Sequence, residues 1–105
     1  MLNPVKKILW WLLAGTAGGI NRGRIIEKIM NNPMNANELA KELGMDYKTV
    51  RHHLKILEKN SLISSMGEGY GKMYFISELL EENINYFNEI WERIGKNKIN
   101  KGGMR

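Results

Sequence analysis

The chain has 105 residues, a net charge of +5 and no cysteine. This length is enough for one domain with one modest hydrophobic core. The lack of cysteine excludes disulfides, thiolate nucleophiles and cysteine-based zinc sites. The basic balance favours an anionic partner, either a nucleic acid or an anionic membrane surface.

Charge is unevenly distributed along the chain. Residues 21–60 contain eight basic and five acidic residues, whereas residues 78–95 contain five glutamates and one arginine. Such segregation is typical of a protein that applies one face to DNA. The apolar run 8–14 is too short to cross a bilayer, which needs about 20 residues. We therefore expect no integral membrane association and a cytoplasmic protein.

The first predicted helix runs from about Asn3 to Ala14, and a glycine-rich loop ends it. Three further helices share one start signal. A polar capping residue is preceded by an apolar residue, and a second apolar residue lies five positions after the first, as in a hydrophobic staple. The capping residues are Asn21, Asn35 and Asp46, and the helices are expected over Arg22 to about Asn31, Ala36 to Leu43 and Tyr47 to Lys59.

After Asn60 the pattern changes to short β-like runs. Leu62–Met66 and Lys72–Ile76 flank a glycine-rich loop and predict a β-hairpin, with Met73 and Phe75 on one face. Ser77 can cap a final helix that ends at about Ile94. We expect one domain over 1–95, made of a helix and loop at 1–20, a core at 21–77 and a helix at 78–95. A basic tail at 96–105 is expected to be disordered.

This order of elements predicts a winged helix-turn-helix fold, mainly α with a small β-hairpin. Two helices that cross steeply need a small residue at their contact, which Ala40 supplies. The tight turn needs a residue that tolerates positive φ, which Gly44 supplies. Val50 is expected to close the small core between the two helices.

Residues 35–77 resemble the ArsR-type winged helix-turn-helix regulators, especially the small archaeal members. The resemblance rests on Glu38-Leu39-Ala40, Leu43-Gly44, Thr49-Val50-Arg51-His52-His53-Leu54-Lys55, Leu57 and Leu62-Ile63. It covers under half of the chain, and the flanking helices agree in order only. It implies a homodimeric, sequence-specific transcriptional regulator that binds pseudo-palindromic double-stranded DNA, with the helix from Tyr47 in the major groove. The alternatives are a protein-interaction module and a non-specific architectural DNA-binding protein.

Helix geometry identifies the residues that would face DNA. If Val50, Leu54 and Leu57 are buried, the opposite side of the same helix is exposed. Arg51 is the best candidate for a base edge because a guanidinium binds guanine bidentately, and the lysines suit phosphate. The candidate DNA-binding residues are Tyr47, Lys48, Thr49, Arg51, His52 and Lys55 on the helix, with Tyr70 and Lys72 on the wing.

No metal, cofactor or catalytic site is predicted. His52 and His53 are adjacent and point about 100° apart on a helix, so they cannot easily share a metal. His53 occupies a position that packs inward, and we expect it to be a semi-buried structural histidine. Many ArsR-type regulators sense metals through cysteines or histidines, and this chain has no cysteine and no histidine in its last helix. No nucleophile–base pair or paired-carboxylate site points to an enzyme.

The first and last helices carry apolar stripes that predict a dimer interface. The candidate dimerisation residues are Leu9, Trp10, Leu13, Leu80, Ile84, Phe87, Trp91 and Ile94. Two alternatives remain open. The two helices could pack on each other within one chain, or Trp10 and Trp11 could lie in a membrane interface beside Lys6 and Lys7.

Overall fold

The structure, a computed structural model, describes the backbone of residues 3–103 and the side chains of residues 3–94. The elements are α1 (Pro4–Ala14), α2 (Gly19–Asn31), β1 (Met34–Asn35), α3 (Ala36–Leu43), α4 (Tyr47–Lys59), β2 (Ile63–Met66), the 3-10 turn η1 (Gly69–Gly71), β3 (Met73–Ile76), α5 (Glu78–Glu82) and α6 (Ile84–Gly103). The predicted class, mainly helical with a small sheet, is confirmed.

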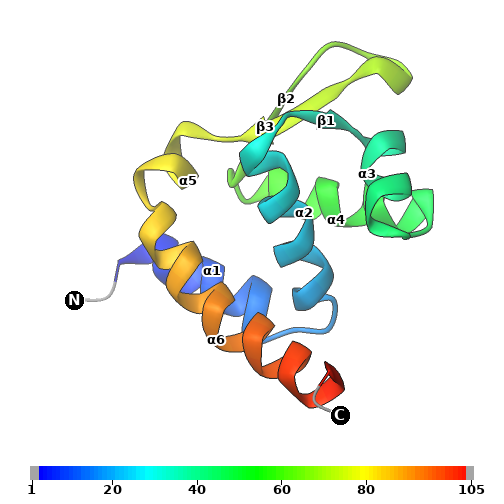
Figure 1. Cartoon of the computed structure of the whole chain (residues 1–105). Helices are drawn as coiled ribbons and strands as arrows, with labels where there is room; N and C mark the ends of the chain where they lie inside the picture. The colour runs from blue at the N-terminus through cyan, green and yellow to red at the C-terminus, as the bar shows by residue number, and fades with distance from the viewer. Residues whose placement is uncertain (1–2, 104–105) are drawn as a thin grey trace.

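The first and last helices and the β-hairpin occupy opposite ends of the molecule (Figure 1). Figure 1 shows α1 and α6 side by side at one end, α2 in the middle, and the β2–β3 hairpin at the other end. The helix α2 packs on α1, α3, α4, α6 and β3, so it forms the centre of the core. In the described part of the chain, no helix is both long enough and apolar enough to cross a membrane.

The N-terminal caps of α3 and α4 are those the sequence predicts. The Asn35 side chain accepts a hydrogen bond from the Glu38 N–H at 2.8 Å, and the Asn35 N–H donates to the Glu38 carboxylate at 2.9 Å. Asp46 accepts from the N–H groups of Lys48 and Thr49. Gly44 lies between the helices at φ 64°. Local side-chain chemistry therefore fixes both helix starts.

The predicted start of α2 at Arg22 is wrong. The helix begins at Gly19, with Gly18 as its N-cap at φ 86° and no side-chain cap, so Asn21 lies inside the helix. A Cβ on Gly19 would lie 1.9 Å from the carbonyl oxygen of Leu13. Close backbone packing on the end of α1 therefore sets this start, and a capping side chain does not.

The wing belongs to a three-stranded antiparallel sheet with the order β1-β3-β2. The hairpin is confirmed, with Ile63 opposite Ile76 and Met66 opposite Met73. The sequence did not predict β1, which pairs Met34 with Tyr74. Tyr74 is buried in the core at 4% exposure, whereas Met73 and Phe75 on the other face of β3 are half-buried. The short β1 ties the start of α3 to the wing.

The C-terminal segment departs from the single predicted helix in two ways. Ser77 caps α5 as expected, but α5 ends at Glu82 and Asn83 separates it from α6. The Asn83 side chain donates to the Leu79 carbonyl at 2.9 Å, which is the kind of local bond that interrupts helices. The helix α6 then continues to Gly103, so the end predicted near Ile94 is wrong, and residues 104–105 lie outside the described residues.

Half of the predicted dimerisation residues lie inside the chain's own core. Leu9, Leu13, Leu80 and Phe87 are at most 2% exposed, and α1 packs against α6 within one chain. The first and last helices therefore pack on each other within one chain, which was the alternative to a dimer interface. These four side chains are not free to contact a second copy. Ile84, Trp91 and Ile94 are half-buried, whereas Trp10 remains 46% exposed and its neighbour Trp11 61% exposed.

Candidate nucleic-acid interface

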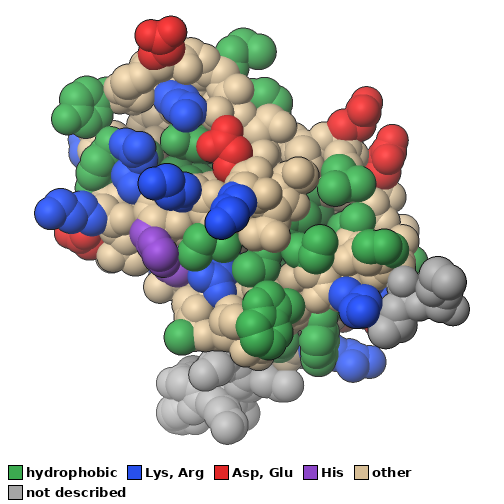
Figure 2. Space-filling model, turned by 180° about the vertical axis from the view of Figure 1, so that it is seen from behind, with side chains coloured by type: hydrophobic (Ala, Val, Ile, Leu, Met, Phe, Trp, Pro, Cys, Tyr) green, Lys and Arg blue, Asp and Glu red, His purple; other side chains and the backbone are tan. Residues whose placement is uncertain are grey.

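The solvent-facing side of α4 is basic. Lys48, Arg51, His52 and Lys55 are exposed, while Val50, Leu54 and Leu57 on the opposite side are buried as predicted. The four exposed side chains line one surface hollow together with Lys72 of the wing. Figure 2 shows Lys and Arg side chains gathered beside a histidine on this side of the molecule. The fold thus brings together five of the eight predicted DNA-binding residues.

One acidic residue also lines this basic hollow. Glu58, which the sequence analysis did not single out, accepts a hydrogen bond from the Ser65 hydroxyl at 2.7 Å. This bond ties the last turn of α4 to β2. On the other wall, the Lys72 ammonium lies 5.8 Å from the centre of the buried Tyr74 ring, which holds it near the wing strand.

Tyr47, Arg51 and Tyr70 form a cluster at the start of α4. The Arg51 guanidinium donates to the Tyr47 hydroxyl at 3.2 Å and lies 5.9 Å from the centre of the Tyr47 ring. This hydroxyl raises the pKa of Arg51 above its ordinary value. The Tyr70 ring, carried by η1, lies 6.2 Å from the Tyr47 ring. Tyr47 and Tyr70 line a second hollow with Asn35, Asn37 and Gly71.

Thr49 is the predicted residue that joins neither hollow. It is exposed in the first turn of α4, and its N–H donates to the Asp46 carboxylate at 3.3 Å. Glu68 is exposed at the tip of the wing, next to η1. A carboxylate there opposes the approach of a phosphate, and the basic group that the wing adds to the hollow is Lys72, which directly follows η1.

A buried arginine, Arg22, contacts α4 on its buried side. Arg22 of α2 is 4% exposed and donates to the carbonyls of Leu12 at 2.9 Å and Ala17 at 3.0 Å and to the Thr16 hydroxyl. Its guanidinium also lies 3.2 Å from Nδ1 of His53, which is 6% exposed as the sequence predicts. Burial, with Arg22 nearby, lowers the pKa of His53.

Sequence reasoning missed Arg22 because an arginine in an amphipathic helix is ordinarily solvated. One signal was present. Three glycines at positions 18, 19 and 23 surround it, and small residues let a backbone and a large side chain approach closely.

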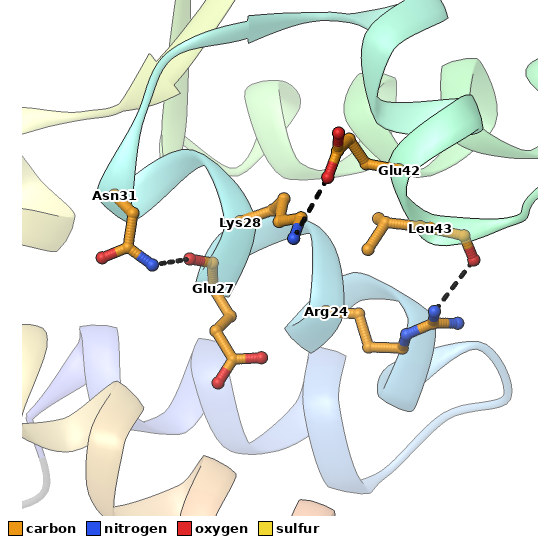
Figure 3. A network of polar contacts seen from close by, with 6 residues as sticks. All are labelled: Arg24, Glu27, Lys28, Asn31, Glu42 and Leu43. Carbon is orange, nitrogen blue, oxygen red and sulfur yellow. Dashed lines mark hydrogen bonds and ion pairs between the residues drawn. The ribbon is translucent and has the colours of Figure 1, made fainter.

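A second polar network joins α2 to α3. Arg24 donates to the Leu43 carbonyl at the C-terminal end of α3 at 2.8 Å, and the Lys28 ammonium lies 3.4 Å from the Glu42 carboxylate (Figure 3). Asn31 donates to the Glu27 carbonyl within α2. A cation at a helix C-terminus is favourable, so Arg24 helps to set the position of α3 and of the turn that precedes α4.

Within residues 3–94, the histidines and carboxylates form no group of three or more that could hold a metal ion. Nδ1 of His53 already contacts the Arg22 guanidinium, and the ring centre of His52 lies 5.5 Å from that of His53. The site therefore offers cationic donors on the exposed side of α4, together with the half-buried Tyr47 and the exposed Tyr70.

The fold and this surface define the chain as a winged helix-turn-helix protein. Residues 21–65 match the model of the bacterial regulatory proteins of the arsR family. This match confirms, for that segment, the resemblance predicted from the sequence.

One curated relative and two solved structures extend the comparison. The chain is 35% identical over 54 residues to an HTH-type transcriptional regulator of Methanocaldococcus jannaschii; the match covers 51% of this chain and 14% of the relative. The fold is similar to that of reduced HlyU from Vibrio cholerae, with TM-score 0.62, 19% identity and coverage of 86% and 88% of the two chains. It is also similar to the homodimeric winged helix-turn-helix DNA-binding domain of Mb0332 from Mycobacterium bovis, with TM-score 0.63, 17% identity and coverage of 82% and 75%.

Proposed function

We propose that this protein is a sequence-specific DNA-binding transcriptional regulator that acts in the cytoplasm and binds a pseudo-palindromic site as a homodimer. The observation that carries the proposal is the hollow between α4 and the wing, where Lys48, Arg51, Lys55 and Lys72 converge. Four cations on and beside the exposed face of one helix suit the phosphates that flank a major groove. The arsR-family match over residues 21–65 supports the same function.

The side chains divide the recognition of DNA between them. Lys48, Lys55 and Lys72 contact phosphates, which sets the register of the protein on the duplex without reading sequence. Arg51 stands between Lys48 and Lys55 on the exposed side of α4 and reads a guanine edge bidentately. His52, exposed in the same hollow, adds a further donor or acceptor.

The dimer is proposed from the apolar face that α1 leaves exposed. Trp10 and Trp11 are 46% and 61% exposed, although aromatic side chains of this size bury most of their surface in folded proteins. The similar fold of Mb0332 is a homodimer. A two-fold dimer would place two copies of α4 on half-sites about 34 Å apart, which is one turn of DNA.

Fluorescence anisotropy tests the proposal directly. The chain is titrated with a labelled duplex from the region upstream of its own coding sequence and with a scrambled duplex of equal length, over a series of salt concentrations. We expect tighter binding to the native duplex that survives at higher salt. Equal and steeply salt-dependent binding would support the architectural alternative, because phosphate contacts alone release counterions without reading sequence.

Variants of α4 assign the roles of its residues. Arg51→Ala should abolish the preference between the two duplexes, since a bidentate contact supplies about 1–3 kcal/mol of discrimination. Lys59→Ala is the matched control, because Lys59 is exposed in the last turn of α4 and lies outside the basic hollow. Unchanged discrimination in Arg51→Ala would refute Arg51 as the reader. Absence of binding to either duplex would favour the protein-interaction alternative.

A further inference from the structure

We infer that Tyr47 is a positioning residue that holds the guanidinium of Arg51 in place for base reading, and that Tyr70 of the wing braces Tyr47 in that role. This inference rests on the proposed function and deepens it. Tyr47 was expected to touch DNA itself. The geometry assigns it a role that acts through Arg51.

The contact between Tyr47 and Arg51 is made one turn apart on the same helix. The Arg51 Nη1 donates to the Tyr47 hydroxyl at 3.2 Å, and the guanidinium carbon lies 5.9 Å from the ring centre. Residues at i and i+4 are neighbours on a helix surface, so the two side chains can meet within α4 itself. Arg51 is exposed and its side chain is long, whereas Tyr47 is half-buried and packs against the core. The anchored ring thus restrains the mobile guanidinium.

The contact with Tyr47 leaves enough N–H donors of Arg51 free to bind a base. A guanidinium has five N–H donors in a planar fork, and a bidentate contact with guanine uses two of them. Tyr47 engages one donor, on Nη1, and no other hydrogen bond from Arg51 is found among the described residues. A guanidinium that is ordered before binding loses less entropy when it meets the base, which is worth about two- to tenfold in affinity for one flexible side chain.

Tyr70 connects the Tyr47–Arg51 pair to the wing. Its ring is 82% exposed, yet it lies 6.2 Å from the Tyr47 ring with the two planes tilted by 41°. Tyr70 lies in η1, flanked by Gly69 at φ 62° and by Gly71, so the turn is shaped to carry its ring toward α4. The Tyr70 ring thus restricts the movement of Tyr47 on the side where the wing approaches.

The first test uses Tyr47→Phe, which removes the hydroxyl and keeps the ring. The probe is the duplex enriched from a randomised library by the wild-type chain, compared with the same duplex carrying one changed base pair at the position that Arg51→Ala no longer distinguishes. Tyr47→Phe should lower this discrimination about two- to tenfold. Tyr86→Phe is the matched control, because Tyr86 lies on α6 beside Lys6 and lines neither hollow, and it should change nothing. Unaltered discrimination in Tyr47→Phe overturns the inference.

A double-mutant cycle separates positioning from direct contact. If Tyr47 acts through Arg51, then Tyr47→Phe weakens binding to the enriched duplex in the wild-type background and has no further effect on that affinity in the Arg51→Ala background. The same loss in both backgrounds would mean that Tyr47 contacts DNA itself, and it would overturn the inference. Tyr70→Ala should reproduce part of the Tyr47→Phe loss, whereas a loss that persists in Arg51→Ala would show that the Tyr70 ring acts by its own contact with DNA.

A measurement on the free protein keeps the inference separate from the proposed function. Nitrogen-15 relaxation of the arginine side chains reports the order of each guanidinium without DNA. We expect Arg51 to be ordered in the wild type and mobile in Tyr47→Phe, with the buried Arg22 as the ordered reference in both. An Arg51 that is equally mobile in the wild type and in Tyr47→Phe overturns the inference even where DNA binding is specific. An ordered Arg51 in a protein that binds no DNA would refute the proposed function and uphold the contact.

Discussion

Arg22 and His53 are a buried polar pair in which one partner must stay neutral. The Arg22 guanidinium can only donate, so the Nδ1 of His53, 3.2 Å away, accepts and the ring proton lies on Nε2. A second proton on His53 would turn the acceptor into a donor and place two cations in contact. The remaining titratable group that lowers the pKa of His53 is the neighbouring His52, another potential cation.

This pair predicts that stability falls in mild acid. The pKa of His53 is lowered in the folded state below its ordinary value of 6.5, so the unfolded chain binds more protons than the folded one as the pH falls below that value. The contribution is fully present above pH 6.5, is lost progressively below it, and is lost completely once the pH lies below the folded pKa. A folded-state pKa that is lower by one pH unit reduces the free energy of unfolding in acid by about 1.4 kcal/mol. Urea unfolding at a series of pH values between about 7.5 and about 5.5 measures the loss. The lower limit keeps the pH above the pKa values at which Asp and Glu side chains take up protons.

Two histidine variants make this pH dependence specific. His53→Gln removes the titrating group and should flatten the dependence across this range, at a cost in stability from imperfect packing. His52→Gln is the matched control, because His52 is exposed beside it on α4 and contributes less to lowering the pKa of His53 than burial and Arg22 do, so this variant should keep most of the dependence. If His53→Gln retains the wild-type slope, the buried pair is not its source.

At the scale of the elements, the packing of α2 on α6 depends on the missing side chain of Gly23. A Cβ at this position would lie 2.3 Å from Cζ3 of Trp91 and 2.5 Å from its Cε3. The Trp91 ring is itself stacked on the buried Phe87 ring at 6.1 Å. Gly23→Ala should therefore displace Trp91 and lower the free energy of unfolding by about 1–3 kcal/mol, as overpacking does in other cores.

Thermal or urea unfolding of two glycine variants checks this packing. Gly71→Ala is the matched control, since no heavy atom lies within 4 Å of a Cβ built there, and its stability should change by less than about 0.5 kcal/mol. Equal effects of the two substitutions would show that the α2–α6 contact is looser than the structure has it. The measurement concerns the core alone and is independent of DNA binding.

Elements fixed by local chemistry could be predicted from the sequence, and elements fixed by contacts distant in sequence could not. The starts of α3 and α4 follow from Asn35 and Asp46, whose caps act within three residues. The start of α2 depends instead on the close approach of Gly19 to the Leu13 carbonyl. The strand β1 forms because Met34 pairs with Tyr74, which lies forty residues later in the chain. A local cap at Asn21 was available, and the tertiary contact overrode it.

The site shows the same division. Helix periodicity was enough to place Lys48, Arg51 and Lys55 on the exposed side of α4, and the position of His53 in the helix-turn-helix motif predicted its burial. It could not reveal Arg22, whose burial depends on three acceptors at the end of α1 and in the loop after it. Nor could it bring Tyr70 to Tyr47, since that contact requires the wing to fold back toward α4.

At the scale of the whole molecule, the open question is what covers the outer face of α1. Leu9, Leu12 and Leu13 on its inner face are buried in the chain. Trp10, half of whose surface is exposed, lines a hollow between α1 and α6 with Lys6, Glu89 and Arg93. Exposed aromatic surface with charged groups of both signs around it suits a self-complementary contact between two copies.

The dimer proposal predicts that this face controls both oligomeric state and DNA affinity. Trp10→Ser combined with Trp11→Ser should convert a dimer to a monomer in sedimentation equilibrium without unfolding it, because neither ring is part of the buried core. The monomer should keep its affinity for a single half-site and lose about 10²–10⁴-fold on the full pseudo-palindrome, which is the usual contribution of a second linked contact. Met66→Ser is the matched control, because Met66 is 69% exposed at the end of β2. The hairpin that β2 forms lies at the opposite end of the molecule from α1 (Figure 1). A double tryptophan variant that remains dimeric would place the interface elsewhere. Flotation of the wild-type chain, but not of this variant, with anionic vesicles would then assign the face to a membrane surface.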